Sequence, residues 1–220
     1  MKSRKYEKHL AYYELLEELR KSRRCSFCVL ERTGIRKYFE GLLYEKVNDV
    51  GIRAALARSR GFCPRHAHIL SSFGDALGTA ILYADQLRLR LESLEVGPRR
   101  RSPARSEQGL CPACQAEIRM RQAHVRTLLH GLADPEMAAA WAGSAALCFP
   151  HFTLAMSEAK DPEVKSALVR TQGARLKGLA SQVKQLIDRY DHLRAAEGFE
   201  EEKDSWLRAV EMISGLKTVF

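Results

Sequence analysis

The stretch Cys25-Ser26-Phe27-Cys28 opens a pattern that this chain contains twice. After 34 further residues (29–62) comes a second motif, Cys63-Pro64-Arg65-His66. The same two motifs recur as Cys111-Pro112-Ala113-Cys114 and Cys148-Phe149-Pro150-His151, with 33 residues (115–147) between them. All six cysteines of the chain lie in these motifs. The repeat predicts a duplicated architecture in which each copy carries one CxxC and one CxxH motif.

The motifs supply the ligands for two metal sites, each with three cysteines and one histidine. Zinc favours four thiolate and imidazole ligands in a tetrahedron, and paired ligands a few residues apart are typical of structural sites. We therefore expect two zinc ions, held by Cys25, Cys28, Cys63, His66, Cys111, Cys114, Cys148 and His151.

Two pairings of these motifs satisfy the ligand count. In the simpler one, each half of the sequence closes its own site, with Cys25, Cys28, Cys63 and His66 in one and the later four ligands in the other. The nearly equal spacings of 34 and 33 residues favour this pairing. A crossed arrangement between the halves remains an alternative.

Other uses of the cysteines are weaker alternatives. A redox CxxC motif usually accompanies a βαβ pattern, which is not visible here. Inert buried cysteines and disulfides within each CxxC remain less favoured readings. An iron–sulfur cluster with three cysteines and one histidine is compatible with the spacing. We rank zinc first because thiolate with imidazole suits it, and because ferredoxin-like cysteine runs are missing.

The apolar residues predict an all-α fold, a duplicated helical hairpin or bundle with two pseudo-symmetric sites. Their spacing follows the i, i+3, i+4 rhythm of amphipathic helices, and no strand alternation of useful length is present. We expect apolar stripes in the core at Ile35, Tyr38, Phe39, Leu42, Leu43 and Val47, at Ile81, Ala84, Leu87, Leu91 and Leu94, at Leu176, Leu179, Val183, Leu186, Ile187, Tyr190 and Leu193, and on two terminal helices over 5–21 and 203–216. Pro64, Pro112 and Pro150 suit the first turn of a helix.

The chain divides naturally where its composition changes. Residues 97–109 are rich in Pro, Gly, Ser and Arg, which is typical of a solvated linker. We expect a first metal-binding repeat over 1–96, this basic linker, and a second repeat with long C-terminal helices over 110–220.

The bulk properties narrow the class of protein. The 220 residues carry a net charge of +9, and 45% of them are apolar. No apolar run approaches a membrane span, and no secretory signal is recognised, so we expect a cytoplasmic protein without a membrane partner. The basic residues Arg20, Lys21, Arg23 and Arg24 precede the first CxxC. A soluble basic surface is the preferred reading, and binding of nucleic acid or another polyanion is the alternative.

No catalytic constellation accompanies the motifs. Four protein ligands close a zinc shell, whereas a catalytic zinc keeps one position open. We therefore expect a non-enzymatic zinc protein that serves as a binding or regulatory scaffold, with an unidentified protein partner. Two alternatives remain, a redox or iron–sulfur protein that uses the same ligands, and a sequence-independent nucleic-acid-binding protein.

The four motifs together resemble an uncharacterised bacterial family, a domain of unknown function with repeated CxxC and CxxH motifs. The resemblance rests on Cys25-Ser26-Phe27-Cys28, Gly61-Phe62-Cys63-Pro64-Arg65-His66, Leu110-Cys111-Pro112-Ala113-Cys114 and Leu147-Cys148-Phe149-Pro150-His151. It implies a bacterial cytoplasmic protein with a cysteine-rich metal-binding role, and it supplies no reaction.

Overall fold

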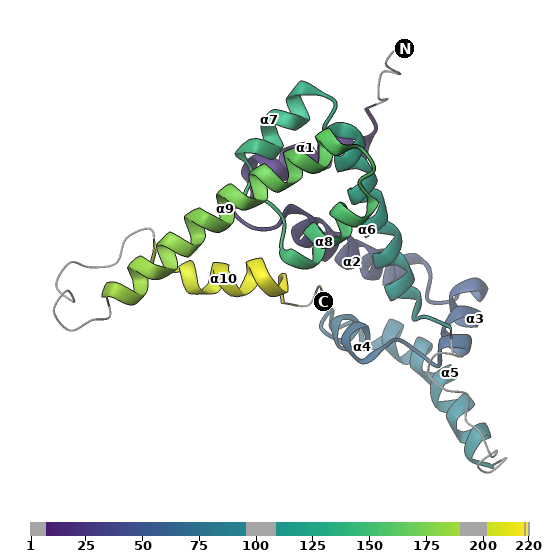
Figure 1. Ribbon diagram of the computed structural model, residues 1–220. Helices are drawn as coiled ribbons and strands as arrows, with labels where there is room; N and C mark the ends of the chain where they lie inside the picture. The colour runs from purple at the N-terminus through teal and green to yellow at the C-terminus, as the bar shows by residue number, and fades with distance from the viewer. Residues whose placement is uncertain (1–7, 96–108, 190–201, 218, 220) are drawn as a thin grey trace. The chain divides into compact units, whose positions relative to one another are not determined.

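The computed structural model describes residues 8–95, 109–189, 202–217 and 219, and these contain helices without any strand. The all-α prediction is confirmed for this part of the chain. The helices, in chain order, are α1 (Leu10–Lys21), α2 (Ser26–Glu45), α3 (Val50–Ser59), α4 (Pro64–Ser71), α5 (Ala76–Glu95), α6 (Pro112–Gly131), α7 (Pro135–Gly143), α8 (Phe149–Glu158), α9 (Pro162–Arg189) and α10 (Ser205–Ser214) (Figure 1).

The helices repeat as the motifs do. Helices α2 and α6 both have 20 residues, and each begins within or directly after a CxxC motif. A short helix follows in each case, α3 with 10 residues and α7 with 9. Next comes a helix that carries the CxxH histidine, α4 or α8, and then a long helix, α5 or α9. The duplicated arrangement inferred from the motifs is therefore visible in the order and lengths of the helices.

The chain forms two compact units that differ from the two halves of the sequence. Unit 1 combines Met1–Arg32 with Arg121–Phe220, and unit 2 is Thr33–Met120. The divisions fall inside α2 and α6, so each of these helices contributes residues to both units. The expected boundaries at 1–96 and 110–220 therefore follow the sequence repeat but not the compact units. Of the expected linker over 97–109, all but Gly109 lies outside the described residues.

The core of unit 1 surrounds Trp141 of α7, which is almost completely buried. Its indole Nε1 donates a hydrogen bond to the carbonyl of Ala167 at 3.2 Å. Buried Gln172 of α9 holds the segment before α8, because its amide donates to the carbonyl of Leu147 at 2.8 Å and its Oε1 accepts from the Leu147 N–H at 3.2 Å. These paired hydrogen bonds position the residue next to Cys148.

The core of unit 2 is built on Phe39 of α2, which is completely buried. Its ring packs edge-on against Phe62 with 5.3 Å between the ring centroids. Leu56 of α3, Leu70 of α4 and Leu82 of α5 complete the same cluster. Burial of several large apolar side chains at about 1.5–3 kcal/mol each is the main force that holds these helices together.

Two of the expected core stripes are wrong in their direction. On α5 the side chains Leu87, Leu91 and Leu94 are exposed, whereas Leu82 and Gln86 are buried. On α10, within the terminal helix expected over 203–216, the apolar side chains of Trp206, Val210 and Ile213 are also exposed. Periodicity identifies a helix, but which face is covered depends on the neighbouring helices. Of the α9 stripe, Leu186 is buried and Ile187 is exposed, while Tyr190 and Leu193 lie outside the described residues.

Candidate metal centres

The eight motif residues gather into two groups of four. The first cluster contains Cys25, Cys28, Cys148 and His151, and the second contains Cys63, His66, Cys111 and Cys114. Within each cluster the four potential ligand atoms all lie within 4.8 Å of one another. Each compact unit therefore holds one complete set of three cysteines and one histidine.

The preferred pairing of motifs within each half is wrong, and the crossed pairing is found. Each CxxC motif meets the CxxH motif of the other half. The division of the compact units accounts for this, because it falls inside α2 and inside α6. Cys25 and Cys28 lie before the first division, whereas Cys63 and His66 lie after it, so the two motifs belong to different units. The second division likewise separates Cys111 and Cys114 from Cys148 and His151.

All four motifs lie at the N-termini of helices. Cys63 is the N-cap of α4 and Cys148 the N-cap of α8, each followed by a proline in the first turn. Cys25 directly precedes α2, and Cys111 directly precedes α6. Pro112 likewise opens α6, which confirms the placement expected for the three prolines. The free N–H groups and the positive end of the helix dipole favour thiolate over thiol at these positions.

The spacing of the first cluster matches a small tetrahedral ion. His151 Nδ1 lies 3.5 Å from Cys25 Sγ, 3.5 Å from Cys28 Sγ and 3.3 Å from Cys148 Sγ, and the sulfurs of Cys28 and Cys148 are 3.6 Å apart. Usual zinc bond lengths give a tetrahedron with S···S edges of about 3.8 Å and S···N edges of about 3.6 Å. The donor atoms therefore surround a space of the size that one such ion needs.

The second cluster has nearly the same dimensions. His66 Nδ1 lies 3.2 Å from Cys63 Sγ, 3.6 Å from Cys111 Sγ and 3.3 Å from Cys114 Sγ. The sulfurs of Cys63 and Cys114 are 3.6 Å apart, and all six cysteines of the chain are free rather than disulfide-bonded. The two clusters thus offer equivalent donor sets in two separate units.

In each cluster a buried carboxylate lies against the histidine ring, on the side away from the cysteines. The motifs did not lead us to expect either carboxylate. His151 Nε2 lies 2.9 Å from Glu31 Oε1, and Glu31 accepts a bidentate pair of hydrogen bonds from Arg121. In the second cluster His66 Nε2 lies 3.2 Å from Glu117 Oε1, and Arg65 pairs with the other oxygen of Glu117. A carboxylate behind a ligating histidine fixes the ring orientation and raises its basicity.

The signal for these carboxylates is present in the sequence. Glu31 follows Cys28 by three residues, and Glu117 follows Cys114 by three residues, so both copies read C-x-x-C-x-x-E. Three residues further along a helix lies on the same face. The spacing therefore places the carboxylate on the same helix face as the second cysteine of the CxxC motif.

In the first cluster, the close approach of the cysteines, the histidine and Glu31 shifts the pKa values of these groups. Burial lowers the pKa of His151, but Cys148, Cys25 and Glu31 raise it more, to about 11. Burial raises the pKa of Cys25, yet hydrogen bonds from Cys148, Cys28 and His151 bring it well below the usual value. Hydrogen bonds with Cys148 and Cys25, together with burial, raise the pKa of Cys28. Without a cation, this group therefore holds a thiolate beside an imidazolium and keeps another thiol protonated.

The second cluster shows the same division of charge. Burial raises the pKa of Cys111, but its interactions with His66, Cys63 and Cys114 outweigh this and lower it to about 7. Burial and the negative charge of Cys111 raise the pKa of Cys114 to about 12. The pKa of His66 is raised to about 9, since Cys111 and Glu117 outweigh the effect of burial. All three sulfurs could ionise together at these distances only with a cation among them, so the donor set fits a bound metal ion.

The other histidines that the structure describes do not join either cluster. His68 is exposed on α4. His124 of α6 lies beside the first cluster, with its ring centroid 5.8 Å from that of Phe27, and burial lowers its pKa. The Nδ1 atom of His124 has no hydrogen-bond partner among the described residues. His192 lies outside the described residues.

Among the described residues, no helix has the length and apolar character required to cross a membrane.

Comparison with known proteins leads to an uncharacterised group. Residues 7–106 match the model of a family of unknown function (DUF6062), and this match includes Cys25, Cys28, Cys63 and His66. The chain is also 27% identical over 199 residues to an uncharacterized 23.9 kDa protein in the xynA 3' region of Caldicellulosiruptor sp. (strain Rt8B.4), which covers 89% of this chain and 97% of that protein. No solved structure matches the chain. The resemblance inferred from the motifs is confirmed, and this chain is similar to proteins of a family that has no assigned function.

Proposed function

We propose that each cluster binds one zinc ion, and that the two ions hold the helices of a non-enzymatic scaffold protein in place. The observation that carries the proposal is the spacing of the donor atoms. Four of the six edges in each cluster measure 3.2–3.6 Å, and none exceeds 4.8 Å. These values suit a single ion with direct bonds to all four ligands.

The same spacing argues against the iron–sulfur alternative. In a multi-iron cluster the ligands bind different irons, with inorganic sulfide between them. The protein donors must then stand further apart than the atoms of either cluster do. A single tetrahedral ion accounts for the close approach of the sulfurs, and thiolate with imidazole favours zinc among the common ions.

A structural role follows from the ligand count and the surroundings. Three cysteines and one histidine fill the shell, which leaves no open position for a substrate or for water. The clusters join helix starts that are far apart in sequence, since Cys28 and Cys148 are 120 residues apart. Ions at these positions would contribute their binding free energy directly to folding. The exposed apolar face of α10, with Trp206, Val210 and Ile213, supports a protein partner for the scaffold.

Elemental analysis of anaerobically purified protein tests this proposal. We expect two zinc ions per chain without acid-labile sulfide. Cys63→Ser should lose one of the two, and Ser93→Ala, a change at an exposed position of α5 in the same unit, should lose none. Iron with sulfide, or an unchanged zinc content in Cys63→Ser, would overturn the assignment.

A further inference from the structure

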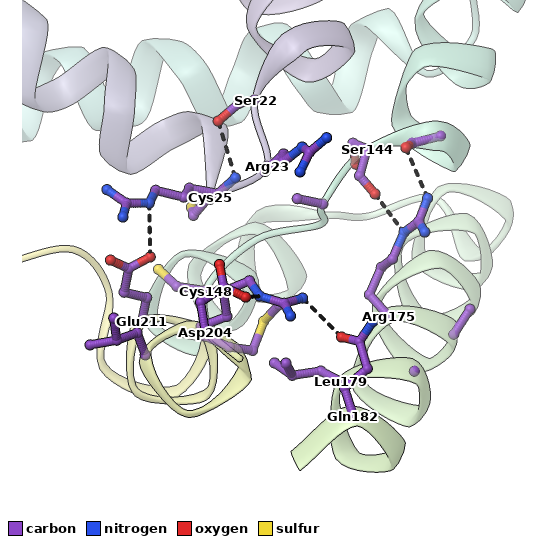
Figure 2. Close-up of a pocket in the computed structure, with 18 of the residues that line it drawn as sticks. Ser22, Arg23, Cys25, Ser144, Cys148, Arg175, Leu179, Gln182, Asp204 and Glu211 are labelled. Carbon is purple, nitrogen blue, oxygen red and sulfur yellow. Dashed lines mark hydrogen bonds and ion pairs between the residues drawn. The ribbon is translucent and has the colours of Figure 1, made fainter. Parts of the chain in front are cut away.

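A pocket of about 820 Å³ opens beside the first cluster (Figure 2). Its walls come from the α1–α2 connection, the α7–α8 connection, α9 and α10, all within unit 1. Cys25 and Cys148 form part of its lining. The volume lies within the range of small-molecule sites, about 300–1,000 Å³.

The lining carries a strong excess of positive charge. Seven cationic side chains face two carboxylates, those of Asp204 and Glu211. Arg208 pairs with Asp204 at 2.8 Å, and Arg24 pairs with Glu211 at 3.2 Å. Of the five further cations of the lining, Arg20 pairs with Glu136 at 2.9 Å and Lys21 pairs with Glu17 at 3.3 Å, both outside the lining. The other three are Arg23, Arg175 and Lys203.

Three of these cations have no carboxylate partner among the described residues and could therefore contact a ligand. Arg23 and Lys203 are exposed and have no ion-pair partner among the residues that the structure describes. Arg175 is fixed by hydrogen bonds that it donates to the carbonyls of Ser144 at 2.6 Å and Gly143 at 2.8 Å (Figure 2). These acceptors are uncharged, and no carboxylate among the described residues pairs with the guanidinium of Arg175.

The shape of the lining favours a small ligand over a nucleic-acid strand. Gly143, Ala145, Ala174 and Gly178 leave room for close approach to the backbone, and a Cβ atom added at Gly178 would meet nothing within 4 Å. No aromatic side chain lines the pocket within the described part of the chain. Strand-binding proteins usually stack bases on such rings.

We propose that this pocket binds a small ligand that carries several phosphate groups. Guanidinium groups recognise phosphate oxygens through paired, charge-assisted hydrogen bonds. A phosphate group carries more negative charge per volume than a carboxylate, which suits a pocket where Arg23, Arg175 and Lys203 have no carboxylate partner among the described residues. The ligand would sit over the metal-binding end of α8 without displacing a metal ligand.

Calorimetric titration with tripolyphosphate tests this site on protein that holds its full metal content. Gly178→Glu places a carboxylate in the pocket on an exposed position of α9, where glutamate is a better helix former than glycine. We expect this variant to bind at least tenfold more weakly. Gly173→Glu is the matched control, since it adds the same charge to the same helix outside the lining, where a Cβ also meets open space. It should bind like the parent protein.

A second pair of variants removes charge instead of adding it. Arg23→Ala should weaken tripolyphosphate binding several-fold, whereas Lys165→Ala, which removes an exposed cation from another part of α9, should not. Absence of binding at low salt would overturn the proposal, as would equal losses in Gly178→Glu and Gly173→Glu.

Two comparison ligands separate the alternatives. Equally tight binding of citrate would overturn the phosphate class, and tighter binding of an oligonucleotide that ignores Gly178→Glu would point to a nucleic-acid surface instead. Metal content measured on the same samples keeps this test distinct from that of the zinc proposal. Protein with two zinc ions and no anion binding would refute the pocket alone.

Discussion

The two clusters have the same ligands but different exposure. In the first, Cys28, Cys148 and His151 are completely buried, and Cys25 is 9% exposed. In the second, His66 is completely buried, whereas Cys63 and Cys114 are partly exposed to solvent. The outer carboxylates follow the same order, because Glu31 is fully buried and Glu117 is 5% exposed.

The clusters also differ in how the outer carboxylate is held. Glu31 receives its arginine from α6, about 90 residues away in the sequence, while Glu117 pairs with Arg65, the residue next to His66. The first site is thus tied into the core of its unit, and the second is assembled mainly from its own motifs. The difference teaches that the same donor set can be enclosed by the core in one unit and be partly open to solvent in the other.

Double cysteine variants should give the largest effect, because they test the crossed pairing directly. Cys28→Ser with Cys63→Ser removes a ligand from each cluster, so we expect both metal ions to be lost. Cys28→Ser with Cys148→Ser alters one cluster only, and one ion should remain. Metal analysis distinguishes the two cases, and the reverse result would restore pairing within each half.

Single ligand variants should differ in their cost to stability. Cys148→Ser leaves a buried cluster without its ion, so we expect a loss of several kcal/mol and the larger fall in thermal midpoint. Cys63→Ser should lower the midpoint less, because water can reach the remaining ligands. Thermal unfolding followed by circular dichroism measures both. A larger fall in Cys63→Ser would contradict the order drawn from burial.

Removing the outer carboxylates should weaken metal binding about 10–100-fold. Glu31→Gln should have the stronger effect, because Glu31 is completely buried and lies 2.9 Å from His151 Nε2, whereas Glu117 lies 3.2 Å from His66 Nε2. Glu117→Gln should affect the second ion alone, and Glu92→Gln, which alters an exposed residue of α5, is the control. Competition with a chromogenic chelator gives the affinities. Equal affinities in all three variants would show that the carboxylates do not tune the sites.

We expect the second cluster to lose its metal ion faster than the first. A chelator or a thiol-modifying reagent should reach Cys63 and Cys114 first, and we expect two phases that differ about tenfold or more in rate. Mass spectrometry of partly modified protein should locate the first labels in the second cluster. Labels that appear first on Cys28 or Cys148 would refute the assignment.

Acidification should release metal, and zinc binding should release protons. In the metal-free protein the pKa of His66 is raised to about 9 and that of His151 to about 11, so both rings are protonated at pH 7. Metal must displace these protons and those of the thiols, which means that affinity falls as pH falls. Calorimetry in two buffers of different ionisation enthalpy counts the protons. A proton release of zero at pH 7 would contradict this picture.

The cluster residues and the helical fold could be predicted from the sequence, but the pairing of the motifs could not. The motifs named all eight cluster residues, because ligand spacing is a local property of the chain. The pairing depends on the division of the compact units inside α2 and α6, which the equal motif spacings do not reveal. Glu31 and Glu117 could have been found from their shared spacing after the CxxC motifs. The exposed faces of α5 and α10 could not, since burial depends on packing between distant segments.

The crossed pairing has a consequence for the order in which the protein matures on the ribosome. Cys63, His66, Cys111 and Cys114 are all synthesised by residue 114, so the second ion can be captured while the rest of the chain is still being made. Cys25 and Cys28 must wait for His151 before their own site closes. A fragment that ends near residue 106 would contain four ligands and no complete cluster. With metal bound as proposed, the first cysteines to emerge would be the last to gain all their partner ligands, and the nascent chain would carry them as open thiols for most of its synthesis.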